Sequence, residues 1–111
     1  MVALTKLIIA LGVVAGRVIA YSGDMTYYNP GLGFCGQTNG DNDEVVALSP
    51  GDVSGKCGKT IRIHKDGKTA TAKVVDKCPG CAGGSIDVSP VVFDKLANRD
   101  QGRVKVTWEF I

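Results

Sequence analysis

Apolar and polar residues alternate most clearly in the second half of the chain. Residues 104–110 alternate Val, Val, Trp and Phe with Lys, Thr and Glu, which predicts a strand with one buried face. Residues 59–76 predict a β-hairpin, because isoleucines alternate with polar neighbours on one side of the Asp66-Gly67 turn and a run of Thr, Ala and Val follows it. These two segments predict three antiparallel strands.

Shorter patterns complete the predicted fold. We expect a leader at residues 21–24, a first strand at 25–29, a buried strand at 45–48 and a loop at 51–58. Ser89, followed by a proline at the first helical position, predicts a helix. Its apolar face would be formed by Val92, Phe93, Leu96 and Ala97. Five or six short strands with one helix and many glycines are typical of a small closed barrel.

Two segments of the sequence resemble each other around a Ser-Pro pair. They are VALSPGDV at residues 46–53 and IDVSPVVF at residues 86–93. This internal echo predicts a barrel with pseudo-symmetry.

The first twenty residues have the pattern of a signal peptide. Lys6 precedes an apolar run at residues 7–15, which is too short to span a bilayer, and residues 18–20 resemble a cleavage site. We therefore expect a secreted protein with one domain at residues 21–111. The whole chain has 13 Lys and Arg against 11 Asp and Glu, and removal of Lys6 and Arg17 leaves 11 against 11. A neutral domain predicts neither a nucleic acid nor a membrane as its partner.

The four cysteines follow the expected signal peptide, and an even number in an oxidising compartment predicts two disulfides. Three pairings are possible, and we favour Cys35–Cys57 with Cys78–Cys81. Spacing argues against a four-cysteine zinc site, which needs two close pairs, since Cys35 and Cys57 lie 22 positions apart. A redox-active C-x-x-C would start a helix, but glycines follow Cys81. We expect neither a metal nor a cofactor.

Candidate chemistry depends on two aspartates. The only histidine, His64, lies beside the hairpin turn, so no Ser-His-Asp triad is expected. Asp76 ends the predicted hairpin. Asp87 lies between Ile86 and Val88, an apolar setting that would raise its pKa and suit a general acid acting on a glycosidic oxygen. A purely structural alternative remains open, in which Asp87 supports the helix N-terminus and Asp76 binds loop amides.

Several motifs in order resemble a known group: TYY (26–28), CGKTIRI (57–63), VVDKCPGC (74–81), IDVSP (86–90) and VKVTWEF (104–110). They resemble the expansin-related double-psi β-barrel proteins, which include rare lipoprotein A-like, barwin-like and fungal loosenin-like domains. The resemblance covers nearly all of residues 21–111. It implies a mainly β fold, a six-stranded double-psi β-barrel with one or two short helices and a polysaccharide groove across one face.

The resemblance also implies roles for individual residues. Asp87 matches the functional acid, and Asp76 matches its partner aspartate. Thr26 and Tyr28 match groove residues on the first strand. Tyr28, together with Tyr27 or Phe34, is the candidate surface for stacking on a sugar.

Two positions bear on catalysis and stacking. Asn29 stands where related hydrolases carry their catalytic base, and an inverting hydrolase needs two carboxyl groups. Steady hydrolysis is therefore not expected. Trp108 alternates with apolar residues, which predicts a core position rather than a sugar platform.

Our leading hypothesis is a secreted, monomeric protein that binds cellulose, chitin or a related glucan and loosens cell-wall networks without net hydrolysis. One alternative is a barwin-like cysteine-protease inhibitor or secreted effector. It would bind its partner through loops at residues 31–36 or 37–44, with Asp87 dispensable. Another alternative is a weak lytic transglycosylase-like or endoglucanase-like enzyme.

Overall fold

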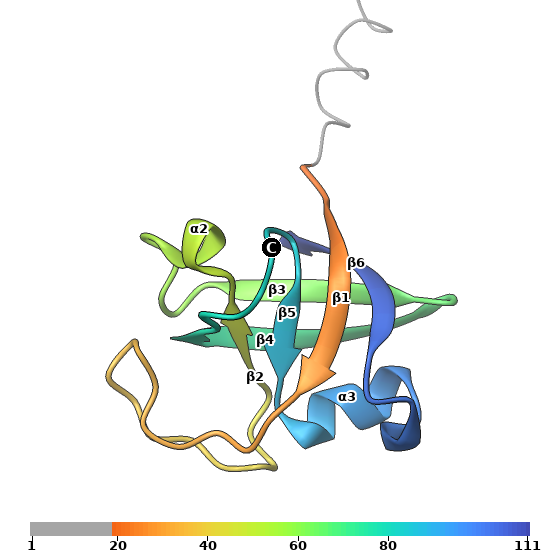
Figure 1. Cartoon of the computed structure of the whole chain (residues 1–111), viewed down its shortest axis with the longest axis horizontal. Helices are drawn as coiled ribbons and strands as arrows, with labels where there is room; N and C mark the ends of the chain where they lie inside the picture. The colour runs from red at the N-terminus through yellow and green to blue at the C-terminus, as the bar shows by residue number, and fades with distance from the viewer. Residues whose placement is uncertain (1–18) are drawn as a thin grey trace, which may run out of the picture.

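Six strands close on themselves in the order β1-β5-β2-β4-β3-β6 (Figure 1). The computed structural model describes residues 19–111, so the expected signal peptide lies, up to residue 18, outside the described residues. The strands are β1 Tyr21–Tyr27, β2 Val45–Leu48, β3 Thr60–Lys65, β4 Lys68–Lys77, β5 Ile86–Val88 and β6 Val104–Phe110. The helical segments are α2 Pro50–Val53, α3 Pro90–Leu96 and the 3₁₀ turn η1 Arg99–Gln101. The predicted six-stranded, mainly β barrel is confirmed.

The predicted hairpin is β3 and β4. Its turn residues Asp66 and Gly67 have φ angles of 50° and 79°. Two consecutive positive φ angles are the signature of the tight turn that suits the right-handed twist of paired strands. The predicted strands at residues 45–48 and 104–110 are likewise confirmed as β2 and β6.

The predicted leader at residues 21–24 is wrong, because these residues belong to β1. They pair with β6 in antiparallel register, beginning with Tyr21 opposite Trp108. Gly23 interrupts the alternation that would have indicated a strand. It is required because the backbone of Gly84 crosses β1 at this point, and a Cβ on Gly23 would collide with it.

Both helices start at a Ser-Pro pair. Val92, Phe93 and Leu96 of the predicted α3 face are buried, whereas Ala97 follows the helix and is partly buried. The Ser89 side chain makes no capping bond to the helix. Its hydroxyl instead accepts a hydrogen bond from the Val45 amide at 3.5 Å. The prediction of a loop at residues 51–58 is wrong for residues 51–53, which belong to α2. Within residues 19–111, no helix is long and apolar enough to cross a membrane.

The two similar sequence segments, residues 46–53 and 86–93, correspond to two units that each consist of a strand, a Ser-Pro pair and a helix. β2 and β5 are antiparallel neighbours, with Ala47 directly opposite Asp87. Each strand is also parallel to a second one, β1 beside β5 and β4 beside β2. Equivalent backbone bonds leave the partner strands, from Tyr28 to the Val88 carbonyl at 2.9 Å and from Cys78 to the Leu48 carbonyl at 2.8 Å. The barrel is therefore pseudo-twofold, and Ala47 takes in one half the place that Asp87 takes in the other.

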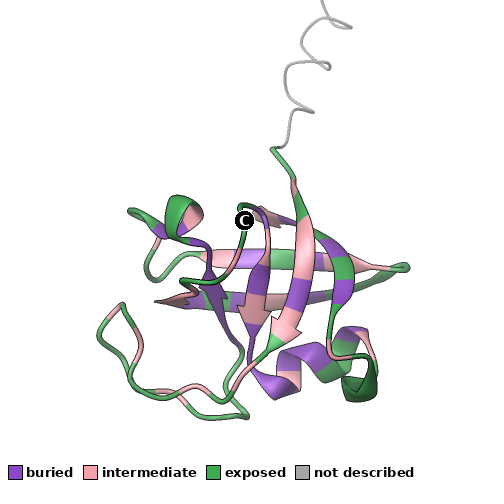
Figure 2. Cartoon of the chain, in the orientation of Figure 1, coloured by how far each residue is buried: buried purple, intermediate pink, exposed green. Residues whose placement is uncertain are grey.

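Buried residues of all six strands, α2 and α3 form one apolar core, and Figure 2 colours the buried positions purple. Trp108 is fully buried there, as its alternation predicted. Its indole stacks on the Tyr21 ring with centroids 4.1 Å apart. Its Nε1 donates to the Gly84 carbonyl at 2.8 Å, so the polar atom of this core residue is satisfied.

The predicted disulfides are confirmed. Cys35–Cys57 joins the loop after β1 to the segment before β3, and Cys78–Cys81 closes the loop after β4. All four thiols are consumed by these two bonds, so none is left to bind zinc.

Candidate functional site

Strand pairing aligns four residues in one row across the sheet, and three of them are predicted site residues. Thr26 on β1 lies opposite Asp87 on β5, Asp87 lies opposite Ala47 on β2, and Ala47 lies opposite Asp76 on β4. Directly opposed residues of paired strands point to the same side of the sheet. We call Thr26, Asp87, Ala47 and Asp76 the aspartate row. The two candidate carboxylates are thus separated by Ala47, which no sequence pattern indicated as part of the site.

A β-bulge places Asp76 on the outer side. Along β2 the pairing passes from Val74 to Asp76, so Val75 is an extra residue in β4. Regular alternation would have turned Asp76 inward with Val74, which lies in the core. The bulge turns Asp76 outward. It also leaves the Val75 carbonyl to accept the Cys35 amide at 3.1 Å. Two successive valines in the sequence gave no sign of this bulge.

Asp87 is a half-buried carboxyl with one hydroxyl donor. Thr26 Oγ1 donates to Asp87 Oδ1 at 3.0 Å. Burial raises the pKa of Asp87, the Thr26 bond and the charge of Arg103 oppose the rise, and the charge of Asp76 adds to it. The predicted rise in the pKa of Asp87 is confirmed. A carboxyl with a raised pKa stays protonated at a higher pH than usual and can then donate a hydrogen bond or a proton.

Asp76 is engaged by three protein donors. Its Oδ1 accepts the amides of Phe34 and Lys77, both at 2.8 Å. Its Oδ2 accepts the Tyr28 hydroxyl at 3.2 Å. Burial, followed by the charge of Asp76, raises the pKa of the Tyr28 phenol, which therefore remains a donor at neutral pH. Asp76 thus binds a loop amide, that of Phe34, as the structural alternative expected. It also lies in the same row as Asp87, with Ala47 between them.

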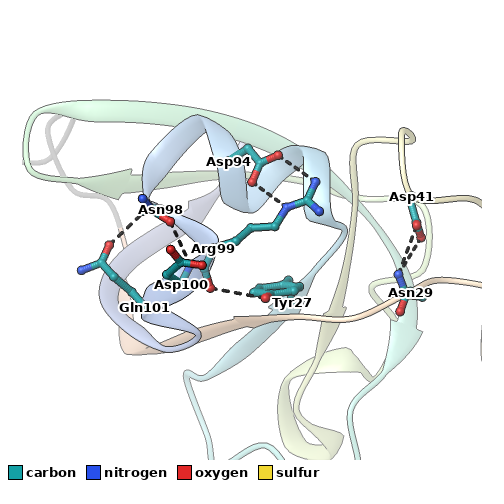
Figure 3. A network of polar contacts seen from close by, with 8 residues as sticks. All are labelled: Tyr27, Asn29, Asp41, Asp94, Asn98, Arg99, Asp100 and Gln101. Carbon is teal, nitrogen blue, oxygen red and sulfur yellow. Dashed lines mark hydrogen bonds and ion pairs between the residues drawn. The ribbon is translucent and has the colours of Figure 1, made fainter.

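Tyr27 lies apart from this row. Its ring packs against Phe93 with centroids 4.8 Å apart, and its hydroxyl donates to the Arg99 carbonyl at 3.3 Å (Figure 3). The alternation of β1 sends Tyr27 to the side of α3, opposite to Thr26. Of the three predicted substrate-binding residues, the structure brings Thr26 and Tyr28 to the aspartates and leaves Tyr27 elsewhere.

Asn29, which the resemblance aligned with the base of related hydrolases, is bound to a neighbouring loop. Its amide donates to both carboxylate oxygens of Asp41 at 3.1 Å (Figure 3). The amide group is fixed by this contact and carries no carboxylate to accept a proton.

A compact loop borders the β4 end of the row, and it contains the predicted loop at residues 31–36. Leu32 and Thr38 form a β-bridge, so residues 31–39 fold back on themselves. Two apolar side chains of this loop are exposed, Leu32 at 77% and Phe34 at 56%. Glycine-rich sequence alone did not indicate that this segment contacts β4.

A hollow of about 590 Å³ lies elsewhere, between β1, β6 and the end of β3. The predicted turn histidine His64 lines it, and His64 Nε2 lies 2.8 Å from Glu109 Oε1. Lys105 beside it is paired with Asp24 at 2.7 Å. The charges of this hollow are therefore largely satisfied by the protein itself.

Parallel pairing of β1 with β5 and of β2 with β4, inside a closed six-stranded barrel, defines the double-psi β-barrel class. A family model described as "Lytic transglycolase" matches residues 21–108. The chain belongs to this double-psi β-barrel family.

Curated relatives include two kinds of protein. The allergen Asp f 7 homolog of Arthroderma benhamiae is 42% identical over 82 residues, which cover 68% of this chain and 28% of that protein. The papain inhibitor of Streptomyces mobaraensis is 34% identical over 101 residues, which cover 81% of this chain and 71% of the inhibitor. The chain therefore spans less than a third of the allergen homolog but most of the inhibitor.

Solved structures share the fold. The Streptomyces papain inhibitor superimposes with a TM-score of 0.75 at 33% identity, covering 86% of this chain and 96% of the inhibitor. A point mutant of Clavibacter michiganensis expansin in complex with cellohexaose gives a TM-score of 0.77 at 24% identity, covering 84% of this chain and 50% of the expansin. The expansin likeness concerns the fold alone.

Proposed function

We propose that residues 21–111 form a secreted, monomeric domain that binds cellulose, chitin or a related glucan and loosens cell-wall networks without net hydrolysis. Residues 1–20 would direct secretion as a signal peptide. The observation that carries the proposal is the aspartate row. Asp87, whose pKa is raised, lies there between Thr26 and Ala47, and Asp76 follows Ala47 on the same outer surface.

In this proposal Asp87 donates a hydrogen bond, or transiently a proton, to a glycosidic or hydroxyl oxygen. Thr26 holds the Asp87 carboxyl through its 3.0 Å bond, and Asp76 holds Tyr28. Contacts between neighbouring glycan chains are themselves hydrogen bonds, so a protein that offers competing donors and acceptors weakens the network. Such a protein needs no covalent intermediate.

The arrangement of carboxyl groups favours loosening over hydrolysis. An inverting glycosidase needs a second carboxylate that is available to activate water. Asp76 already accepts two amides and the Tyr28 hydroxyl, and Asn29 stands at the base position of the related hydrolases. The expansin with the same fold has been crystallised with cellohexaose, which supports a glucan as the ligand class.

The test combines a binding assay with an assay for product. Wild type and Asp87→Asn are incubated with insoluble cellulose and chitin, and retained protein, released reducing sugar and filter-paper strength are measured in parallel. Asp66→Asn is the matched control, since it also removes one carboxylate and asparagine tolerates the positive φ of 50° in this turn. We expect retention and weakening by wild type and Asp66→Asn, loss of weakening in Asp87→Asn, and no sugar release.

Other results would change the proposal. If Asp87→Asn weakens filter paper as well as wild type does, the role of Asp87 is wrong. If wild type releases reducing or anhydro-sugars, the chain is an enzyme of the lytic transglycosylase or endoglucanase kind. If wild type is retained on neither polymer, the polysaccharide proposal fails.

Inhibition of a papain-type protease is a second candidate function. The papain inhibitor is 34% identical to this chain, and the exposed side chains of Leu32 and Phe34 stand on a disulfide-anchored loop. A preordered loop with apolar side chains suits insertion into a protease cleft. Titration of papain activity with wild type and Asp87→Asn tests this, and equal inhibition by both would assign binding to the loops.

A further inference from the structure

We infer that the Phe34 ring is an aromatic subsite at the β4 end of the aspartate row, where one pyranose unit of a neutral glucan or chitin chain stacks. This inference rests on the proposed function, and it selects Phe34 from the three aromatic residues that the sequence offered for stacking. Four observations support it: the exposure of the ring, its attachment to Asp76, the rigidity of its loop and the length of the row.

Phe34 is the most exposed aromatic ring in residues 19–111, at 56%. The remaining aromatic side chains are occupied by protein contacts. Tyr21, Trp108 and Phe110 pack on one another, Tyr27 packs against Phe93, and Tyr28 is bound to Asp76. Phe34 is therefore the aromatic side chain of the described residues that is best placed to contact a ligand.

The ring is attached directly to the row. The Phe34 amide donates to Asp76 Oδ1 at 2.8 Å. Lys77 Nζ lies 4.6 Å from the ring centroid, over one of its faces. Because Lys77 lies over one face, the proposed subsite is the opposite face of the ring, on which the C–H groups of a sugar would stack. Asp87 would then bind a polar group farther along the same glycan chain.

Backbone hydrogen bonds and a disulfide hold the loop that carries Phe34. Gly33 donates to the Gln37 carbonyl at 2.9 Å, Cys35 donates to Val75, and the Cys35–Cys57 disulfide closes the base. A Cβ on Gly33 would collide with the Val75 carbonyl, so the loop is in close contact with β4. A ring held in place before binding loses little conformational entropy when a sugar stacks on it.

The row defines the size of ligand. Neighbouring strands are separated by about 4.8 Å, so the row from β1 to β4 spans roughly 14 Å before Phe34 is reached. A single sugar cannot contact both Thr26 and Phe34, whereas an oligosaccharide of several units can. We therefore expect hexasaccharides to bind and glucose to bind far more weakly.

The experiment measures dissociation constants for cellohexaose and chitohexaose by NMR titration of the purified protein. Phe34→Ala should bind about tenfold more weakly, the loss expected for one aromatic contact. Phe34→Trp should bind at least as tightly as wild type. Leu32→Ala is the matched control, because it shortens a more exposed aliphatic side chain of the same loop, and it should bind like wild type.

The possible failures are distinguishable. If wild type binds both hexasaccharides and Phe34→Ala binds equally well, the subsite is rejected and the proposed function stands. If Leu32→Ala loses as much affinity as Phe34→Ala, the loop acts without a stacking ring and the inference is also wrong. If wild type binds neither hexasaccharide and is retained on neither polymer, both the subsite and the proposed function fail.

Thermal unfolding of each variant is the control for retention of the fold. If Phe34→Ala loses papain inhibition but keeps its affinity for hexasaccharides, the ring belongs to a protease-binding surface instead.

Discussion

Thr26 donates its hydroxyl hydrogen to Asp87 across the β1–β5 pairing, over 3.0 Å. This bond stabilises the ionised carboxylate more than the acid, and so lowers the pKa of Asp87 against the effect of burial. Thr26→Val keeps the shape of the side chain and removes the donor. We expect the pKa of Asp87 to rise further, which a carboxyl ¹³C NMR titration measures.

Loosening should follow the same titration if protonated Asp87 is the active form, so the pH at which activity falls should move upward in Thr26→Val. Thr107→Val on the exposed face of β6 is the control and should leave the pKa of Asp87 unchanged. A pKa of Asp87 that stays constant or falls in Thr26→Val would contradict the assigned role of the hydroxyl.

Asp87→Asn should make the protein more stable at neutral pH. Because burial raises the pKa of Asp87 in the folded state above its usual 3.8, the folded state holds its proton more tightly than the unfolded state does. Wild type therefore loses stability as the pH rises from 3.8 through the raised pKa of Asp87, whereas asparagine does not titrate. Urea unfolding should show a difference at neutral pH that disappears below pH 3.8. A difference that is independent of pH would show that ionisation of Asp87 carries no stability cost.

Trp108→Phe tests the bond between the core and the loop after β4. The substitution keeps an aromatic ring but leaves the buried Gly84 carbonyl without its 2.8 Å donor. We expect the free energy of unfolding to fall by about 1–3 kcal/mol. Chemical denaturation measures the loss, and Phe110→Leu, at the half-buried end of the same strand, should cost less. Equal losses would mean that packing alone decides the cost.

The two disulfides should differ in their contribution. The chain-entropy relation gives about 3 kcal/mol for the 22-residue separation of Cys35–Cys57 and about 2 kcal/mol for Cys78–Cys81. Replacing each pair by serines and measuring urea unfolding tests this order. Loss of Cys35–Cys57 should also weaken hexasaccharide binding, because it releases the loop that carries Phe34. A protein without Cys35–Cys57 that binds as wild type does would show that the loop needs no covalent anchor.

Local sequence patterns predicted the structure correctly where it is determined by residues close together in the sequence. The Asp66-Gly67 turn, the alternation around Trp108 and the apolar neighbours of Asp87 each predicted what the structure has. Sequence patterns failed where the structure depends on contact with a distant part of the backbone. The start of β1 was not predicted because Gly23 interrupts the alternation, and this glycine is needed where the Gly84 backbone crosses the strand.

The site shows the same division between local and distant effects. Both aspartates were predicted from their neighbours, but the bulge at Val75 that turns Asp76 outward depends on its pairing with β2. Ala47 was overlooked because its importance lies in being opposite Asp87 and Asp76, and a single alanine has no signature of its own. Tyr27 was included on its aromatic character, although alternation along β1 already placed it on the other side from Thr26.

Gly33→Ala separates the position of Phe34 from its chemistry. The added Cβ would collide with the Val75 carbonyl, and since this neighbour is backbone it cannot rotate away. The loop must shift, which should lengthen the bond from the Phe34 amide to Asp76 and cost about 1–3 kcal/mol of stability. Hydrogen exchange of the Phe34 amide should speed up and cellohexaose should bind more weakly. Gly31→Ala is the matched control, because a Cβ there meets no atom within 4 Å. If Gly33→Ala and Gly31→Ala protect the Phe34 amide equally and bind cellohexaose alike, then contact with β4 does not position the ring. In that case the affinity attributed to a preordered subsite must come from the aspartate row alone.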